Sequence, residues 1–178
     1  IMVGEIRDAE TAGIAVNTAL TGHLLLSTLH TNDAATTLPR LLDMGIDAYL
    51  VASTVNIAIG QRLIRRICED CKEDYKLSDG EYIALHALLG DRVNRDTTFY
   101  KGRGCASCGG TGFKGRLVLC EVLVVDHDIH EAILKKEPAS RLKEIAIQNG
   151  MTTMLEDGFI KATSGRTTVS EILRTINE

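Results

Sequence analysis

The chain has 178 residues, a formal net charge of -4 and 25% charged side chains. This acidic balance argues against broad nucleic-acid binding, which needs a basic face, and no apolar run approaches the roughly 20 residues that span a bilayer. The 44% of hydrophobic residues can form the core of one domain or of parts of two. Five cysteines without a leader peptide indicate a reducing, cytoplasmic compartment.

The first residues have the pattern of a strand that is already under way. The apolar run Ile1-Met2-Val3 leads directly into Gly4-Glu5, without an initiating Met or a lead-in. We therefore expect the chain to be a piece of a longer polypeptide. The strand would deliver the Glu5 carboxylate to its carboxyl end, which is where α/β sheets place their ligands.

A helix and a second strand should follow. Asp8 is a suitable cap for a helix that ends at Gly22, and residues 23–29 form a continuous apolar run. Such a run is typical of a parallel strand that is covered on both faces. It ends at His30, so Glu5 and His30 would lie side by side if the two strands are neighbours.

The next segments continue the alternation of helices and strands. Asp33 should begin a helix that ends at Gly45, although Pro39 predicts a kink or a late start. Residues 47–54 indicate a short helix and residues 57–64 another strand. This order of elements predicts the α/β class.

Four cysteines occur as two Cys-x-x-Cys pairs, and a fifth lies in an apolar strand pattern. Two such pairs can supply the tetrahedral sulfur shell of a structural zinc ion, because each turn directs two thiolates to one point. Two local disulfides or a redox pair are the alternatives, and neither a secretory signal nor a βαβ redox pattern supports them. The candidate ligands are Cys68, Cys71, Cys105 and Cys108, whereas Cys120 has the pattern of a small buried residue.

The segments around the second cysteine pair have turn and helix signals. Ser78 and Glu81 have capping-box spacing, and residues 91–98 are polar enough for a loop. The glycine-rich run 109–115 resembles a phosphate loop only superficially, since Lys114 is followed by Gly115 rather than Ser or Thr. We interpret it as a zinc knuckle with a tight turn, followed by strand residues 117–125.

The tail should contain three or four short helices between residues 126 and 176. Capping-box spacing occurs at three places, and Gly150 and Gly165 are suitable stops. The three pairs are Asp128 with Glu131, Thr153 with Glu156, and Thr168 with Glu171. The expected inward residues are Leu142, Ile145, Ala146, Met154, Leu155, Phe159, Ile172, Leu173 and Ile176.

Several ordered motifs resemble one family over nearly the whole chain. They are Gly4-Glu5-Ile6-Arg7-Asp8, Thr21-Gly22-His23-Leu24, Ser27-Thr28-Leu29-His30-Thr31-Asn32-Asp33, Gln61-Arg62-Leu63, the four cysteines, Gly112-Phe113-Lys114-Gly115-Arg116 with Glu121, Gly150-Met151 and Leu155-Glu156-Asp157-Gly158. This pattern is similar to that of the secretion ATPases that drive type II secretion and type IV pilus assembly.

The resemblance implies a hexameric, RecA-like motor that hydrolyses ATP with magnesium in the cytoplasm, docked on an inner-membrane platform. It implies that Glu5 is the Walker B acid, that His30 of the His box contacts the γ-phosphate, and that His23 of the same box also serves the nucleotide site. The cysteines match the family's zinc module. The corresponding domains are residues 1–67 of the ATPase core, residues 68–125 of the zinc module and a helical subdomain at residues 126–178.

Two questions stay open at the level of sequence. The 178 residues contain no Gly-x-x-x-x-Gly-Lys-Ser/Thr pattern, so we expect the chain alone to be inactive. A zinc-stabilised docking adaptor without ATPase activity is the alternative function. Arg7 can pair with Asp8 or reach a neighbouring subunit. The other arginines can face phosphate, the next subunit or solvent, or pair locally; they are Arg62, Arg65 and Arg66.

Overall fold

The computed structural model describes residues 1–176, which form two compact units. The N-terminal unit comprises Ile1–Gly60 and Glu121–Thr152, and the cysteine unit comprises Gln61–Cys120 and the chain from Thr153 onward. The units differ from the three consecutive segments expected from the sequence. The reason is that two long strands, β1 (Ile57–Ile67) and β4 (Phe113–Val124), each pass from one unit into the other.

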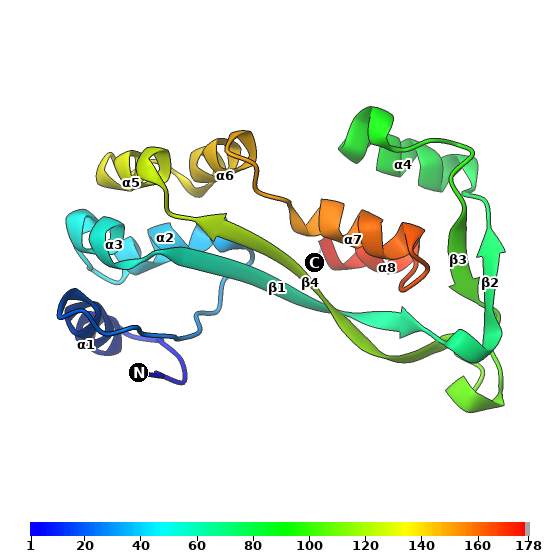
Figure 1. Cartoon of the computed structure of the whole chain (residues 1–178), viewed down its shortest axis with the longest axis horizontal. Coiled ribbons are helices and arrows are strands. Elements are labelled where there is room, and N and C mark those ends of the chain that lie inside the picture. Colours follow the sequence, from blue (N-terminus) through cyan, green and yellow to red (C-terminus); the bar gives the residue numbers. More distant parts are fainter. Residues whose placement is uncertain (177–178) are drawn as a thin grey trace. The chain divides into compact units, whose positions relative to one another are not determined.

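The N-terminal unit is mainly helical. Within it, α3 packs against α1 and α5, and α2 packs against α6 (Figure 1). Its buried core includes Leu38, Val51, Leu123, Ile129 and Leu142. Its helices are α1 (Ala9–Leu20), α2 (Ala34–Asp43), α3 (Ala48–Thr54), α5 (His127–Leu134) and α6 (Ala139–Gln148).

Aspartates precede four of these five helices, and Pro138 precedes α6. The Asp8 side chain accepts a hydrogen bond from the Thr11 N–H, and Asp33 forms a capping box with Thr36. The second helix starts at Ala34 and runs through Pro39, so the late start does not occur. The predicted cap Asp128 is wrong, because Asp126 accepts from the Ile129 N–H and Asp128 lies in the first turn.

The two N-terminal strand segments lie side by side in parallel, but they form only an isolated bridge between Met2 and Leu26. The Val3 N–H donates to the Leu26 carbonyl at 2.9 Å. The expected cover on both faces is wrong, since Leu24 and Leu26 are 76% and 63% exposed. Successive side chains of an extended segment face opposite ways. Leu25 therefore packs on the core of the N-terminal unit, whereas Leu24 and Leu26 face solvent.

The cysteine unit contains one sheet that the sequence did not predict. In it, β2 (Lys72–Tyr75) pairs antiparallel with β3 (Phe99–Gly102), as Figure 1 shows. The long strands β1 and β4 pair with each other. The helices of this unit are α4 (Asp79–Leu89), α7 (Met154–Thr163) and α8 (Val169–Ile176), with short 3-10 turns at Glu69–Cys71 (η1), Gly90–Arg92 (η2) and Ala106–Cys108 (η3).

Two capping boxes in this unit are confirmed and one is half right. Ser78 with Glu81 and Thr153 with Glu156 form both reciprocal bonds. Thr168 accepts from the Glu171 N–H at 3.2 Å, but the Glu171 carboxylate does not return to the cap. The Glu171 carboxylate instead accepts hydrogen bonds from Arg65 of β1.

Helices α7 and α8 pack closely on the core of the cysteine unit. A Cβ atom at Gly158 would lie only 3.0–3.3 Å from side-chain atoms of Ile172, so glycine permits this approach. Phe99 and Leu85 are buried in the same cluster. The predicted inward position of Ile176 is wrong, because this residue is exposed and Thr175 is buried instead.

Candidate functional site

The predicted neighbours Glu5 and His30 are in contact. The His30 Nε2 and Glu5 Oε2 atoms are 3.1 Å apart, and the Arg7 Nε atom lies 2.8 Å from the same oxygen. Both side chains are accessible, at 37% for Glu5 and 80% for His30. Hydrogen bonds from Arg7, and then from His30, lower the pKa of the Glu5 carboxyl group. We call Glu5 and His30 the strand-end pair.

His23, the other residue of the predicted His box, makes a different contact from this pair. The His23 Nδ1 atom is 3.0 Å from the Thr21 hydroxyl, whereas His30 contacts Glu5. Arg7 was expected to pair with Asp8 or to reach another subunit. It pairs with Glu5 instead.

The loop after His30 is held by residues that the sequence analysis gave no role. The Ala34 N–H donates to the Glu121 Oε1 atom at 2.9 Å, and Lys143 Nζ lies 3.0 Å from Asp33 Oδ2. Partial burial opposes ionisation of Asp33, yet hydrogen bonds from the Thr36 N–H and from Lys143 keep its pKa below the ordinary value. A signal existed for Glu121, which is a single carboxylate within an apolar strand pattern.

The four predicted cysteine ligands converge, and all their sulfur atoms lie within 4.8 Å of one another. The Sγ atoms of Cys68 and Cys105 are 3.9 Å apart, as are those of Cys71 and Cys108. A zinc ion bonded to four sulfurs at about 2.3 Å would separate them by about 3.8 Å. Each cysteine is free, which excludes the local disulfides. We call these four residues the cysteine cluster.

The protein environment shifts the pKa values of the cysteine thiols in different directions. The backbone N–H groups of Cys105 and Gly112 donate to Cys108 Sγ at 3.2 and 3.3 Å, and these bonds lower the pKa of Cys108 to about 6. Burial raises the pKa of Cys71 to about 12 and also raises that of Cys68. A thiophilic cation would favour the thiolate at every position, so the donor set fits a metal ion.

The glycine-rich run forms the predicted knuckle beside the cluster. Gly112 has a φ of 77° and lies against Gly102 at the end of β3. A Cβ atom at either glycine would overlap the carbonyl oxygen of the other. The two backbones can therefore meet only because both positions lack a side chain.

One of the unassigned arginines, which is half-exposed, forms an ion pair with a buried glutamate within the cysteine unit. Arg65 Nη2 lies 2.5 Å from Glu171 Oε1, and the Arg65 N–H donates to Glu171 Oε2 at 3.0 Å. These hydrogen bonds lower the pKa of Glu171 to about 2. The Arg65 guanidinium also stacks over the Phe113 ring. Arg66 pairs with Glu69 at 3.0 Å.

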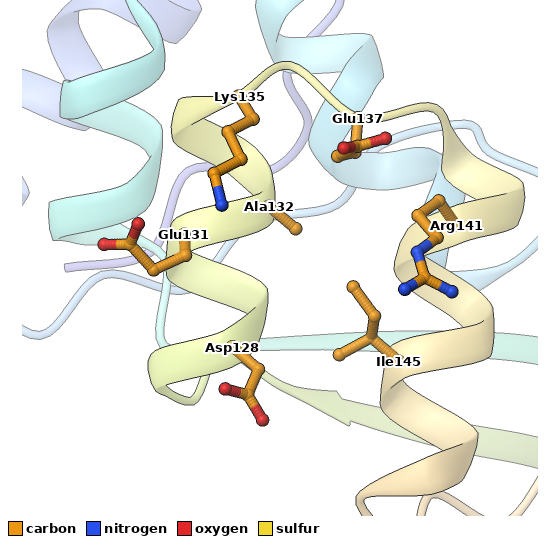
Figure 2. A pocket seen from close by; sticks show the side chains of 7 residues that line it. All are labelled: Asp128, Glu131, Ala132, Lys135, Glu137, Arg141 and Ile145. Carbon is orange, nitrogen blue, oxygen red and sulfur yellow. The ribbon is translucent and has the colours of Figure 1, made fainter.

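A shallow open pocket of about 300 Å³ lies between α5 and α6. Figure 2 shows acidic and basic side chains around its mouth, with Ala132 and Ile145 between the helices. The sequence did not point to it. The lining residues are Asp128, Glu131, Ala132, Lys135, Glu137, Arg141 and Ile145.

Within residues 1–176, no helix is both long and apolar enough to cross a bilayer.

Comparison with known proteins shows similarity over almost the entire chain. The chain is 49% identical to the type IV pilus assembly ATPase PilB of Thermus thermophilus, covering 99% of this chain and 20% of that protein. It is 42% identical to the type II secretion system protein E of Xanthomonas campestris, covering 98% of this chain and 30% of that protein. The chain thus spans between a fifth and a third of these relatives.

Solved structures share the fold at lower identity. The Legionella pneumophila ATPase DotB aligns with a TM-score of 0.65 and 23% identity, over 99% of this chain and 38% of that one. The pilus retraction motor PilT with bound ADP aligns with a TM-score of 0.63 and 22% identity, over 98% and 38%. The family model described as "Type II/IV secretion system protein" matches residues 1–174. The chain therefore belongs to the type II/IV secretion system protein family.

Proposed function

We propose that these residues are the C-terminal part of a hexameric, RecA-like motor ATPase that drives type II secretion or type IV pilus assembly. The contact between Glu5 and His30 at the ends of two adjacent parallel segments carries the proposal. The family match over residues 1–174 supports it. The motor would work in the cytoplasm against an inner-membrane platform, with no nucleic-acid partner.

In this proposal Glu5 is the Walker B acid, because its lowered pKa keeps the carboxylate ionised at neutral pH. His30 contacts the γ-phosphate, since its imidazole is open to solvent and adjoins Glu5. His23, at the start of the chain's second extended segment, is proposed as a further nucleotide contact. Magnesium would supply charge neutralisation at the phosphates when it is bound with ATP.

The chain alone should bind and hydrolyse ATP poorly. The phosphate cradle of P-loop enzymes depends on a glycine-rich loop and its lysine, and this pattern is not among the 178 residues. Turnover would thus need the longer protein. The isolated chain carries the acid and the histidine without the loop that orients the phosphates.

The cysteine cluster is proposed to hold one structural zinc ion. Four thiolates complete a tetrahedral shell and leave no open position for water or substrate. Three of the six sulfur–sulfur separations are 3.7–3.9 Å, and all six are within 4.8 Å, which supports this assignment. Zinc would thus fix the turns that contain the two cysteine pairs.

The test uses the longer protein that contains this chain. Glu5→Gln should lower kcat for ATP hydrolysis by about a hundredfold or more, while nucleotide binding persists, because the amide cannot replace the carboxylate charge. Glu10→Gln is the matched control, since Glu10 is an exposed residue of α1. It should hydrolyse ATP at the normal rate.

Two results would count against the proposal. Undiminished turnover by the Glu5→Gln protein would remove Glu5 from the catalytic role. A longer protein that binds zinc but neither binds nor hydrolyses ATP would favour the docking adaptor. Hydrolysis by the isolated 178-residue chain, lost in its own Glu5→Gln variant, would overturn the proposed need for the longer protein.

A further inference from the structure

Glu121 is a buried carboxylate that the proposed ATPase mechanism does not use. It is 2% exposed, and its neighbours along β4, Leu119 and Leu123, are fully buried apolar residues. A carboxylate in such surroundings is costly unless hydrogen bonds satisfy it. Its position in β4 therefore needs a specific partner, and the structure provides one.

That partner is the start of α2. The Glu121 Oε1 atom accepts a hydrogen bond from the Ala34 N–H, which is the first backbone donor of the helix. Ala34 is itself fully buried, so water cannot replace this acceptor. A carboxylate at this end is also attracted by the helix dipole.

A second contact holds the same turn. Lys143 of α6 donates to the cap residue Asp33, while the other oxygen of Asp33 accepts from the Thr36 N–H. The first turn of α2 is thus fixed by β4 on one side and by α6 on the other. Both partners are distant in sequence and belong to the N-terminal unit.

His30 is close to this turn along the chain. Three residues separate it from Ala34, and the Thr31 hydroxyl lies 3.1 Å from that of Thr37, which ties the loop to the helix. The exposed His30 ring contacts the Glu5 carboxylate at 3.1 Å. Packing around the ring cannot fix its position, so its placement depends on the two flanking backbone segments. Before His30, Thr28 is paired with Gly4 and Ile6; after it, the chain is held where α2 begins.

We propose that Glu121 is a positioning residue for His30: its carboxylate, with Lys143, fixes the first turn of α2 and so sets the contact between His30 and Glu5. The catalytic meaning of that contact rests on the proposed function. The positioning itself is a property of the folded chain and can be measured without nucleotide.

The first experiment follows the histidine rings of the 178-residue chain by ¹H–¹³C NMR, with His30 assigned from a His30→Asn variant. Glu121→Leu should shift the His30 ring signals and raise the exchange rate of the Ala34 amide about tenfold or more, because that N–H loses its acceptor. Glu121→Gln keeps an acceptor oxygen and should restore both observations. The ring signals of His23 should stay in place in both variants.

A control separates positioning from general destabilisation. Leu123→Ala removes a buried side chain from the same strand without touching the hydrogen bond to α2. It should leave the His30 signals unchanged despite a loss of stability. Equal shifts in Leu123→Ala and Glu121→Leu would overturn the proposal, as would an unchanged His30 in Glu121→Leu.

If Glu121→Leu does not fold, the variant Lys143→Met can test the proposal instead. Lys143→Met removes the charge on the exposed side of the turn and should move the His30 signals in the same direction by a smaller amount. Unchanged His30 signals in the folded Lys143→Met chain, together with an unchanged Ala34 exchange rate, would then contradict the proposal.

The second experiment adds the enzymatic readout in the longer protein. Glu121→Leu should lower kcat about tenfold or more while the KM for ATP changes little, and Glu121→Gln should recover most of the activity. Equal losses in kcat and affinity would indicate a general defect and would contradict positioning. If Glu5→Gln leaves hydrolysis intact, the proposed function fails, but the NMR experiment still decides the role of Glu121.

Discussion

The strand-end pair lies at the surface, whereas two cysteines of the cluster are almost inaccessible to solvent. His30 is 80% exposed, while Cys68 and Cys71 are 0% and 3% exposed. The cluster brings together every ligand that a tetrahedral shell requires. The strand-end pair has a carboxylate, an imidazole and an anchoring turn, but no phosphate-binding loop among these 178 residues.

This difference shows how far each site can be understood by itself. A closed metal shell has its chemistry within one unit, so its geometry can be compared directly with known bond lengths. An open site becomes meaningful only with its substrate and with further protein groups. The first region can therefore be tested by removing a ligand atom, and the second by following the position of a side chain.

Metal removal should have the largest effect. Cys71→Ser should abolish metal binding and unfold the turns around the cluster, because the binding free energy of structural zinc is on the order of 10 kcal/mol in small domains. Metal analysis and circular dichroism would measure this. Cys120→Ser is the control, since Cys120 lies outside the cluster, and it should keep one metal ion per chain.

The same experiment can break the comparison between the regions. If the cluster is energetically separate, the His30 and His23 ring signals of Cys71→Ser should match those of the unaltered chain. Loss of those signals together with the metal would mean that the strand-end pair also depends on the cluster.

A core truncation in the N-terminal unit should act on the opposite region. Leu38→Ala should lower the free energy of unfolding by about 3 kcal/mol, because Leu38 is fully buried and its loss leaves a cavity. Denaturant unfolding would measure the change, and metal content should remain at one ion per chain. The exposed Leu20→Ala should have little effect, and a comparable loss there would contradict this interpretation.

The ion pair between Arg65 and Glu171 gives the cysteine unit a dependence on pH. The pKa of Glu171 in the folded protein is about 2, which lies below the reference value of 4.5. The stabilisation by this ion pair is therefore complete above about pH 4.5. It is lost as pH falls toward 2. The contribution is about 2 kcal/mol after allowance for the half-exposed Arg65 side chain.

Unfolding measured between pH 7 and pH 3 would test this prediction. Glu171→Gln should be less stable at pH 7, and its stability should change less between pH 5 and pH 3 because the titrating group is absent. A variant with the same acid sensitivity as the unaltered chain would show that other carboxylates dominate this range.

A helix cap should give the smallest effect. Asp126→Ala should cost about 1 kcal/mol, because the Ile129 N–H loses its acceptor. Asp128→Ala should cost only a few tenths, since Asp128 is not the cap. Thermal unfolding of the two variants compares them directly, and a larger loss for Asp128→Ala would restore the cap expected from sequence.

Local signals predicted much of the fold. Capping residues such as Asp33 and Thr153 act within one turn, and the cysteine spacing needs only that two turns meet. The juxtaposition of Glu5 and His30 followed from two apolar runs joined by a helix. These features depend on short-range geometry or on a simple rule of strand pairing.

Contacts between distant segments could not be predicted. The four-residue segments 72–75 and 99–102 are too short to show a clear strand pattern, and each forms a strand by pairing with the other. Glu171 has capping spacing, but a stronger cationic partner from β1 takes its carboxylate. Glu121 likewise contacts a helix end 87 residues away, for which no periodicity exists.

The meeting of Gly102 and Gly112 has a consequence for exchanging parts between relatives. Because a Cβ atom at one position would overlap the backbone of the other, neither segment tolerates an independent replacement. A chimaera that imports the second cysteine pair must therefore import the end of β3 and the knuckle together. The two segments would have to be exchanged together, although a cysteine pair lies between them in the sequence.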